Sequence, residues 1–156
     1  MRKWLGLAAT VLVIDQLTKQ AITRSFSLHE IVELTPFFNL VLVYNRGAAF
    51  SFLSDAAGWQ RELFIAMALA ASVWIAWLLR KYKAQTMFCL ALSLILGGAI
   101  GNVIDRFLYG GVVDFLDFHA LGYHWPAFNV ADSTISCGAV LLIWDALIAK
   151  GKAAAA

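Results

Sequence analysis

Charged residues are scarce in this chain of 156 residues, because Asp, Glu, Lys and Arg together make up only 14% of it. Hydrophobic residues make up 62%, and the mean hydropathy is +0.76. A soluble globular domain carries about 25% charged residues. The composition therefore excludes an ordinary soluble domain and indicates an integral membrane protein, and the length suggests a single domain.

The sequence also lacks the patterns of several common binding sites. A net charge of +2 without a basic arm gives no support for nucleic-acid binding. Cys89 and Cys137 lie in apolar segments without CxxC or Cys/His spacing, so we interpret both as small core residues rather than as a disulfide. His119 and His124, with Asp117, match no common zinc spacing, and no HExxH, GxSxG or Gly-rich phosphate loop is present. We therefore expect neither a metal nor a cofactor.

Four apolar segments are each near the roughly 20 residues needed to cross a bilayer. They cover about residues 4–22, 63–79, 84–104 and 133–149. The first follows MRK as the apolar part of a cleavable signal peptide would, but no small-x-small cleavage site comes after it, so we interpret it as a membrane anchor. The sequence predicts one membrane-embedded domain over residues 1–152 and a short tail at residues 153–156.

The basic residues predict the orientation of these spans. Seven of the twelve Lys and Arg lie before the first span, between the second and third, or after the fourth, with no acidic residue in those places. The positive-inside rule then puts both termini and the middle loop in the cytoplasm, so the long loops at about residues 24–62 and 106–132 face outward. In the first of these loops, IVELTPFFNLVLVYN mixes β-branched and aromatic residues, which predicts short strands at the membrane surface.

Polar side chains gather near the predicted outer ends of the spans. The first span runs outward and carries two charged residues past its midpoint, the third ends outward in GNVIDR, and the fourth begins at the outer side. Four clusters then reach one depth: Asp15 with Lys19, Asn102 with Asp105 and Arg106, Asp114, and Asp132. Scattered structural ions would not be expected to converge in this way.

Asp114, in VVDFLDF, and Asp132, in FNVADS, are the leading candidates for chemistry. Two carboxylates held a few ångströms apart cannot both ionise easily, so one stays protonated and the pair supplies a general acid and a general base. Such a pair can activate water against a peptide carbonyl. The alternative is structural: each aspartate caps a helix or pairs with a cation such as Arg106, and Asp132 stands where an N-cap would. Composition alone leaves both interpretations open.

The remaining polar residues also have structural interpretations. Asp15 and Lys19 are spaced i,i+4, which favours an ion pair on one helix face, and we expect Lys19→Ala to affect stability more than chemistry. Asn45, in YNRG, suits either a plain turn or a turn that approaches a ligand. Asn102 and Asn129 carry amides that could hold a carboxylate or a carbonyl oxygen. Small residues of the third span are interpreted as helix-packing positions: Gly97, Gly98 and Gly101.

Two classes without peptidase chemistry are also consistent with a small membrane protein. A proton-coupled transporter would place charges along the whole length of the spans and often shows an internal repeat, and neither feature is present here. A non-catalytic lipid-binding subunit explains the predicted topology, but it does not explain two aspartates that converge at the outer surface.

Four motifs in order resemble bacterial lipoprotein signal peptidase, also called signal peptidase II. They are NRGAAFS (45–51), GGAIGNVIDR (97–106), GGVVDFLDF (110–118) and FNVADS (128–133), and the resemblance covers nearly the whole chain. It implies a mainly α integral membrane fold, in which a four-transmembrane-helix bundle carries a small β-sheet and a short helix on the outer, periplasmic side.

The resemblance also implies a function. An aspartic-type endopeptidase of the bacterial cytoplasmic membrane would remove the signal peptide from a diacylglyceryl-modified prolipoprotein, just before the lipidated cysteine. Asp114 and Asp132 match the catalytic aspartates of the family. Further positions match residues that bind substrate or support the site: Asp15, Lys19, Asn45, Gly47, Asn102, Arg106, Asn129 and Ala131. The expected partners are the prolipoprotein and membrane lipid, with the enzyme acting as a monomer.

Overall fold

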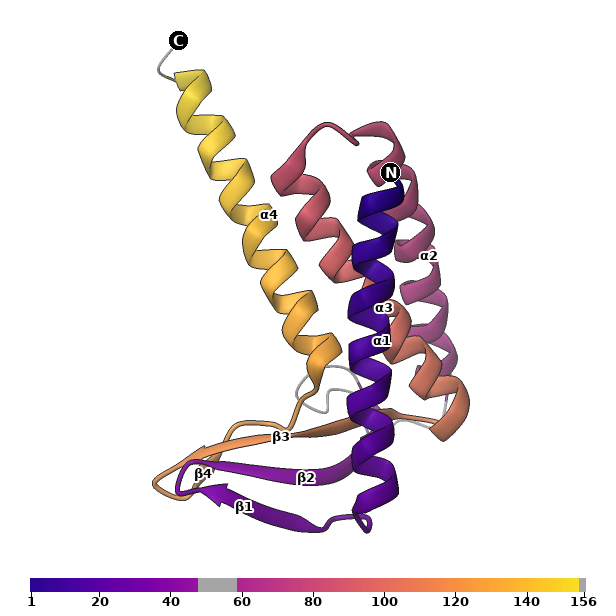
Figure 1. Ribbon diagram of the computed structural model, residues 1–156, viewed down its shortest axis with the longest axis vertical. Coiled ribbons are helices and arrows are strands. Elements are labelled where there is room, and N and C mark those ends of the chain that lie inside the picture. The colour runs from indigo at the N-terminus through magenta and orange to yellow at the C-terminus, as the bar shows by residue number, and fades with distance from the viewer. Residues whose placement is uncertain (48–58, 155–156) are drawn as a thin grey trace.

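Four long helices make up most of the molecule (Figure 1). The computed structural model describes residues 1–47 and 59–154. The helices are α1 (Arg2–Ser25), α2 (Trp59–Lys81), α3 (Thr86–Tyr109) and α4 (Val130–Ala154). All four are long and apolar enough to cross a membrane, which confirms the four predicted spans.

The helix ends differ from the predicted ends by several residues. Helix α3 begins two residues later than expected and continues to Tyr109, through its polar outer end. Helix α4 begins at Val130 and continues to Ala154, into the residues expected as a tail. Hydropathy detects only the apolar centre of a span, whereas the helical backbone continues into the polar layers on either side.

Helix α3 lies at the centre of the bundle. In its most apolar stretch 56% of the residues are buried, against 11% in that of α4. Large apolar side chains on the outer faces of α2 and α4 are exposed, among them Val73, Trp74, Val140 and Ile143. In a bilayer these faces contact lipid, which is as apolar as the side chains themselves.

A four-stranded antiparallel sheet covers one end of the bundle. Its strands are β1 (Ile31–Thr35), β2 (Phe38–Asn45), β3 (Val112–Ala120) and β4 (Tyr123–His124), in the order β1-β2-β3-β4. The first two confirm the strands predicted from IVELTPFFNLVLVYN. Both termini lie at the same end of the bundle, as an even number of spans requires, and the sheet lies at the other end (Figure 1).

Strand β3 was not predicted, because the sequence placed Asp114 in an outer loop. Its first four residues are all buried, so the strand lacks the alternation that marks a half-buried strand. It pairs with β2, and Asp114 stands opposite Val43. The strand therefore gives the aspartate a fixed place beside the bundle.

The short outer helix implied by the resemblance is absent from the part of the chain that the structure describes. Residues 48–58 of the first predicted outer loop lie outside that part, and so does the second half of the NRGAAFS motif.

Two glycines of α3 allow close helix contact, as predicted. A Cβ atom at Gly97 would stand 2.5 Å from the carbonyl oxygen of Ala8 in α1, and one at Gly98 would stand 2.5 Å from that of Ala131 in α4. Gly101 differs, because a Cβ there would collide with the carboxylate of Asp15. This third glycine makes room for a charged side chain.

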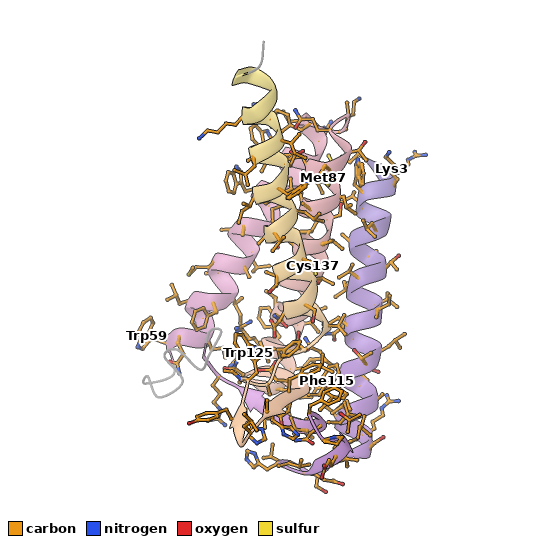
Figure 2. The ribbon with its side chains drawn as sticks, turned by 90° about the vertical axis from the view of Figure 1, so that its left-hand side faces the viewer. Lys3, Trp59, Met87, Phe115, Trp125 and Cys137 are labelled. Carbon is orange, nitrogen blue, oxygen red and sulfur yellow. The ribbon has the colours of Figure 1, made fainter. Side chains whose placement is uncertain are left out.

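Many of the buried apolar residues belong to one of two separate clusters. One contains Trp4, Leu79, Cys89 and Leu96 among others, and it is distant from the sheet. The second joins Ile22, Leu42, Val113 and Phe115 at the sheet. Figure 2 shows Phe115 at this end of the molecule and Lys3 at the other. On α1, Asp15 and Lys19 lie between Ala8 of the first cluster and Ile22 of the second.

The interpretation of both cysteines as core residues is only half correct. Cys89 is fully buried, but Cys137 is exposed, and neither forms a disulfide. Cys137 lies on α4, which is covered by other helices along little of its length. An apolar segment in a membrane helix therefore does not predict burial inside the protein.

Candidate active site

Three charged residues form a buried ion cluster. Lys19 Nζ lies 2.9 Å from Asp15 Oδ2 and 2.7 Å from Asp105 Oδ2, and all three side chains are at most 2% exposed. The first contact confirms the ion pair predicted from the i,i+4 spacing. Buried charges are tolerated only when they are paired and hydrogen-bonded, and Asp105 supplies the second partner.

Further donors satisfy the two carboxylates of this cluster. Gln16 Nε2 donates to Asp15 Oδ2 at 3.2 Å and to Asp105 Oδ1 at 3.0 Å. The main-chain N–H of Ala131 donates to Asp15 Oδ1, and that of Val113 donates to Asp105 Oδ2. No buried side-chain nitrogen or oxygen among the described residues lacks a hydrogen-bond partner.

Asn102 connects the ion cluster to Asp132. Its Oδ1 accepts a hydrogen bond from Lys19 Nζ at 2.9 Å, and its Nδ2 donates to Asp132 Oδ1 at 2.8 Å. The lysine fixes the orientation of the amide, so that the NH₂ group faces the aspartate. Asn102 thereby links the lysine of α1 to the carboxylate of Asp132 on α4.

Asn129 contacts both candidate catalytic aspartates. Its Nδ2 donates to Asp114 Oδ1 at 2.7 Å, and its Oδ1 accepts a hydrogen bond from the main-chain N–H of Asp132 at 2.9 Å. Asn129 is therefore the N-cap of α4, and the capping role considered for Asp132 is wrong. Asp132 lies in the first turn of the helix, and its carboxylate does not cap the helix. The carboxylate can therefore make other contacts.

Arg106 does not neutralise the aspartates through an ion pair. Its guanidinium donates to the main-chain oxygens of Asn102 and Gly47, both at 3.2 Å, and lies over the ring of Phe64. It thereby ties α3 to the segment after β2. In that segment the N–H of Gly47 donates to Asn45 Oδ1 at 3.0 Å, which confirms the turn predicted there.

A cavity of about 440 Å³ opens beside these residues. Polar groups of Asn45, Asn102, Arg106 and Asp132 line one part of it. The rest is lined mainly by the segment before α4 and by the first turns of α4, from Trp125 to Cys137. Figure 2 shows Trp125 near the sheet and Cys137 further along α4. The cavity thus joins a carboxylate to a largely apolar wall.

Asp114 is not among the residues that line this cavity, and it is only 2% exposed. Burial, and after it the nearby charge of Asp132, raises the pKa of its carboxyl group from the ordinary value to about 7. Hydrogen bonds from Asn45 and Asn129, together with the charge of Lys19, oppose this rise. Asp114 can therefore hold a proton at a pH at which an ordinary aspartate is ionised.

Asp117 belongs to a different cluster. It is three residues after Asp114 in β3, so its side chain points to the opposite face of the strand. There His124 Nδ1 lies 3.0 Å from its carboxylate, Asn39 donates to it at 2.9 Å, and the ring of His119 stacks on that of His124. Among the described residues, no group of three or more His, Cys, Asp or Glu is arranged to hold a metal ion.

The structure brings every predicted site residue into one connected set, which also contains Asp105 and Gln16. The sequence placed Asp105 among the polar residues expected at the outer ends of the spans, but it predicted no role in the site for Asp105 or for Gln16. Asp105 had a signal, since GNVIDR places it three residues after Asn102 on one helix face. Gln16 had none beyond its position next to Asp15.

Comparison with known proteins identifies the family. The sequence profile described as "Signal peptidase (SPase) II" matches residues 7–148. The chain is 59% identical over 152 residues to the lipoprotein signal peptidase of Janthinobacterium sp. (strain Marseille), covering 97% of this chain and 92% of that protein. It is 62% identical over 144 residues to the lipoprotein signal peptidase of Ralstonia nicotianae, covering 92% of this chain and 83% of that protein.

The fold is also shared with solved structures. A bacterial membrane enzyme determined by the in meso method at 2.3 Å resolution superposes with a TM-score of 0.87 at 31% identity, covering 97% of this chain and 92% of that one. A second such structure, at 1.9 Å resolution, gives a TM-score of 0.82 at 32% identity and covers 94% of each chain. Since the profile, the relatives and the fold agree over nearly the whole length, the chain belongs to the signal peptidase II family, the lipoprotein signal peptidases.

Proposed function

We propose that the protein is an aspartic endopeptidase that cuts diacylglyceryl-modified prolipoproteins just before the lipidated cysteine, with Asp114 and Asp132 as the catalytic pair. The observation that carries this proposal is the different environment of the two carboxylates. Asp132 is half-buried and lines the cavity, whereas Asp114 is only 2% exposed and has a pKa of about 7. Two titratable groups in such unlike surroundings take the roles of base and acid.

In the proposed reaction, ionised Asp132 takes a proton from a water molecule while the water oxygen attacks the scissile carbonyl carbon. Asp114 gives its proton to the carbonyl oxygen, which produces a neutral tetrahedral diol. The leaving nitrogen then takes the proton from Asp132 as the C–N bond breaks, and the diol returns a proton to Asp114. The pair ends in its starting protonation state, and neither a metal nor a covalent intermediate is needed.

Asparagine side chains provide the polar contacts of this reaction. Asn129 and Asn45 are the candidates for hydrogen bonds to the substrate or to the developing oxyanion, since both reach Asp114. Arg106 supports them by holding the main chain at Gly47. A donor that is in position before the reaction begins stabilises the developing charge without having to move. A single hydrogen bond of this kind to an oxyanion lowers the activation free energy by about 3 kcal/mol.

The membrane would supply part of the substrate binding. We propose that the diacylglyceryl chains lie in the bilayer against the exposed apolar helix faces, which leaves the cleavage site at the cavity. A substrate anchored in this way has already lost much of its freedom before it meets the catalytic pair. The sheet and the site would face the periplasm, with both termini in the cytoplasm of a bacterial inner membrane, as the distribution of Lys and Arg favours. The enzyme would act as a monomer.

Cleavage of a matched pair of substrates tests the proposed function. The purified protein in lipid is given a prolipoprotein with the diacylglyceryl group on its cysteine and the same prolipoprotein without it, and the new N-terminus is sequenced. We expect cleavage of the lipidated form before the modified cysteine and little cleavage of the other. A metal chelator is expected to leave turnover unchanged. Equal cleavage of both forms, or cleavage elsewhere, would contradict the proposed substrate.

The pH dependence of turnover tests the roles of the two aspartates. Because the pKa of Asp114 is raised to about 7, its proton is present below this pH and is lost above it. We therefore expect kcat/KM to fall on the alkaline side with a midpoint near pH 7, and to fall again at acidic pH when Asp132 takes up a proton. An alkaline limb above about pH 9 would assign the acid role to another group, since an ordinary lysine or tyrosine titrates there.

A further inference from the structure

Each candidate catalytic aspartate follows a residue whose main-chain N–H is held by a buried carboxylate. The N–H of Val113 donates to Asp105 Oδ2 at 3.1 Å, at the start of β3. The N–H of Ala131 donates to Asp15 Oδ1 at 2.9 Å, in the first turn of α4. Both acceptors are fully buried, so water does not compete for these hydrogen bonds.

One cation joins the two acceptors. Lys19 Nζ contacts Asp15 Oδ2 at 2.9 Å and Asp105 Oδ2 at 2.7 Å, and Gln16 donates to both carboxylates as well. The main chain before Asp114 and the main chain before Asp132 are therefore linked through a single site on α1. The path runs from β3 through α3 and α1 to α4.

We propose that Asp105 is a positioning residue of this peptidase, which sets the separation of Asp114 and Asp132 by fixing the start of β3 to Lys19. The inference rests on the proposed role of the two aspartates. Asp105 acts through the main chain of Val113 and touches neither the substrate nor the reacting atoms.

The carboxylate chemistry of Asp105 is what this position requires. Three donors meet its two oxygens, because Lys19 Nζ and Val113 N share Oδ2 while Gln16 Nε2 binds Oδ1. An asparagine would offer one acceptor oxygen and would turn an NH₂ group toward one of these donors. Hydrogen bonds to a charged acceptor are also about twice as strong as those to a neutral one. Asp105→Asn thus keeps the size of the side chain and releases part of the network.

The test compares Asp105→Asn with Asp145→Asn, both purified in lipid and assayed with the lipidated prolipoprotein. Asp145 is a half-buried carboxylate near the far end of α4, so its variant controls for loss of a charge from a spanning helix. We expect kcat of Asp105→Asn to fall about 10-fold to 100-fold, with KM within about twofold of the control.

The pH profile separates positioning from a simple loss of folded enzyme. With residue 105 neutral, less negative charge balances the positive charge of Lys19. A wider separation of Asp114 and Asp132 also weakens the effect of the Asp132 charge, which raises the pKa of Asp114. Both changes lower the pKa of Asp114 relative to the wild type, so the alkaline limb of kcat/KM is expected to move to lower pH. A loss of folded protein lowers the amplitude of the profile and leaves its limbs in place.

The proposal is overturned if kcat per folded molecule and the alkaline limb of Asp105→Asn both match those of Asp145→Asn. If Asp105→Asn does not fold, Gln16→Leu replaces it, because Gln16 is only half-buried and this change removes one donor from each carboxylate while it keeps all three charges of the ion cluster. It should lower kcat a few-fold in the same pattern, and an unchanged kcat would overturn the proposal equally. Full activity of Asp114→Asn would instead reject the aspartic mechanism, whichever result Asp105 gives.

Discussion

Asp114→Asn and Asp132→Asn are each expected to lower kcat by about 10⁴-fold or more, because catalytic groups that act as a unit lose nearly all activity when one is removed. Asparagine has nearly the size of aspartate, so Asn129 can still contact the side chain at position 114 and Asn102 the side chain at position 132. What is lost is the proton exchange with water and with the carbonyl oxygen. The measurement is single-turnover cleavage of the lipidated prolipoprotein by protein that has inserted and purified normally.

Each of these variants has a matched control in its own element. Asp117→Asn changes an aspartate three residues further along β3, on the opposite face and in contact with Asn39 and His124. Asp145→Asn changes an aspartate of α4. Both are expected to keep turnover within a few-fold of the wild type. Near-normal cleavage by either catalytic variant would rule out the proposed pair, and equal losses in the controls would show a general defect in folding.

Lys19→Ala is expected to lower the free energy of unfolding by about 3–5 kcal/mol, because it leaves two buried carboxylates without their cation. Asp15 and Asp105 are both fully buried and both contact Lys19 Nζ. The loss should appear as a lower Tm in detergent and as less protein in the membrane. The folded remainder should also turn over more slowly, since the ion cluster holds the main chain beside the catalytic pair.

The neighbouring variant Gln20→Ala controls for a change of side-chain length on α1, because Gln20 is exposed. It should change the free energy of unfolding by no more than about 0.5 kcal/mol, as surface substitutions usually do, so Tm should stay close to that of the wild type. A Lys19→Ala protein as heat-resistant as the wild type would show that the carboxylates are protonated or otherwise satisfied without the lysine. A heat-resistant but inactive Lys19→Ala protein would assign the lysine to chemistry.

The spans could be predicted from the sequence because a bilayer sets both their length and their composition. No comparable rule marks the polar ends of the helices. The sequence therefore did not predict that α3 continues through Asp105 and Arg106 to Tyr109. The strands β1 and β2 were predicted from alternating β-branched and aromatic residues. Strand β3 was not, because its first residues are buried on both faces and its partner β2 is distant in sequence.

The candidate site was predictable wherever a residue type carried the signal. Asp114 and Asp132 stand out as carboxylates among apolar residues, and Asn102 and Asn129 as amides close to them in sequence. The part that could not be predicted depends on the main chain. Asp105 and Asp15 accept hydrogen bonds from the N–H groups of Val113 and Ala131, and every non-proline residue carries such a group, so the identity of these partners leaves no trace in the sequence.

The position of Lys19 on α1 has a consequence for biogenesis. The ribosome delivers α1 to the membrane first, and at that stage the lysine can pair only with Asp15 of its own helix. Asp105 arrives with α3, and the N–H of Ala131 arrives only with the last span. Lys19 therefore has both of its carboxylate partners once α3 is in the membrane, and the N–H that binds Asp15 follows with α4. Asp132 also lies on α4, so the proposed peptidase cannot act before the last span has been synthesised.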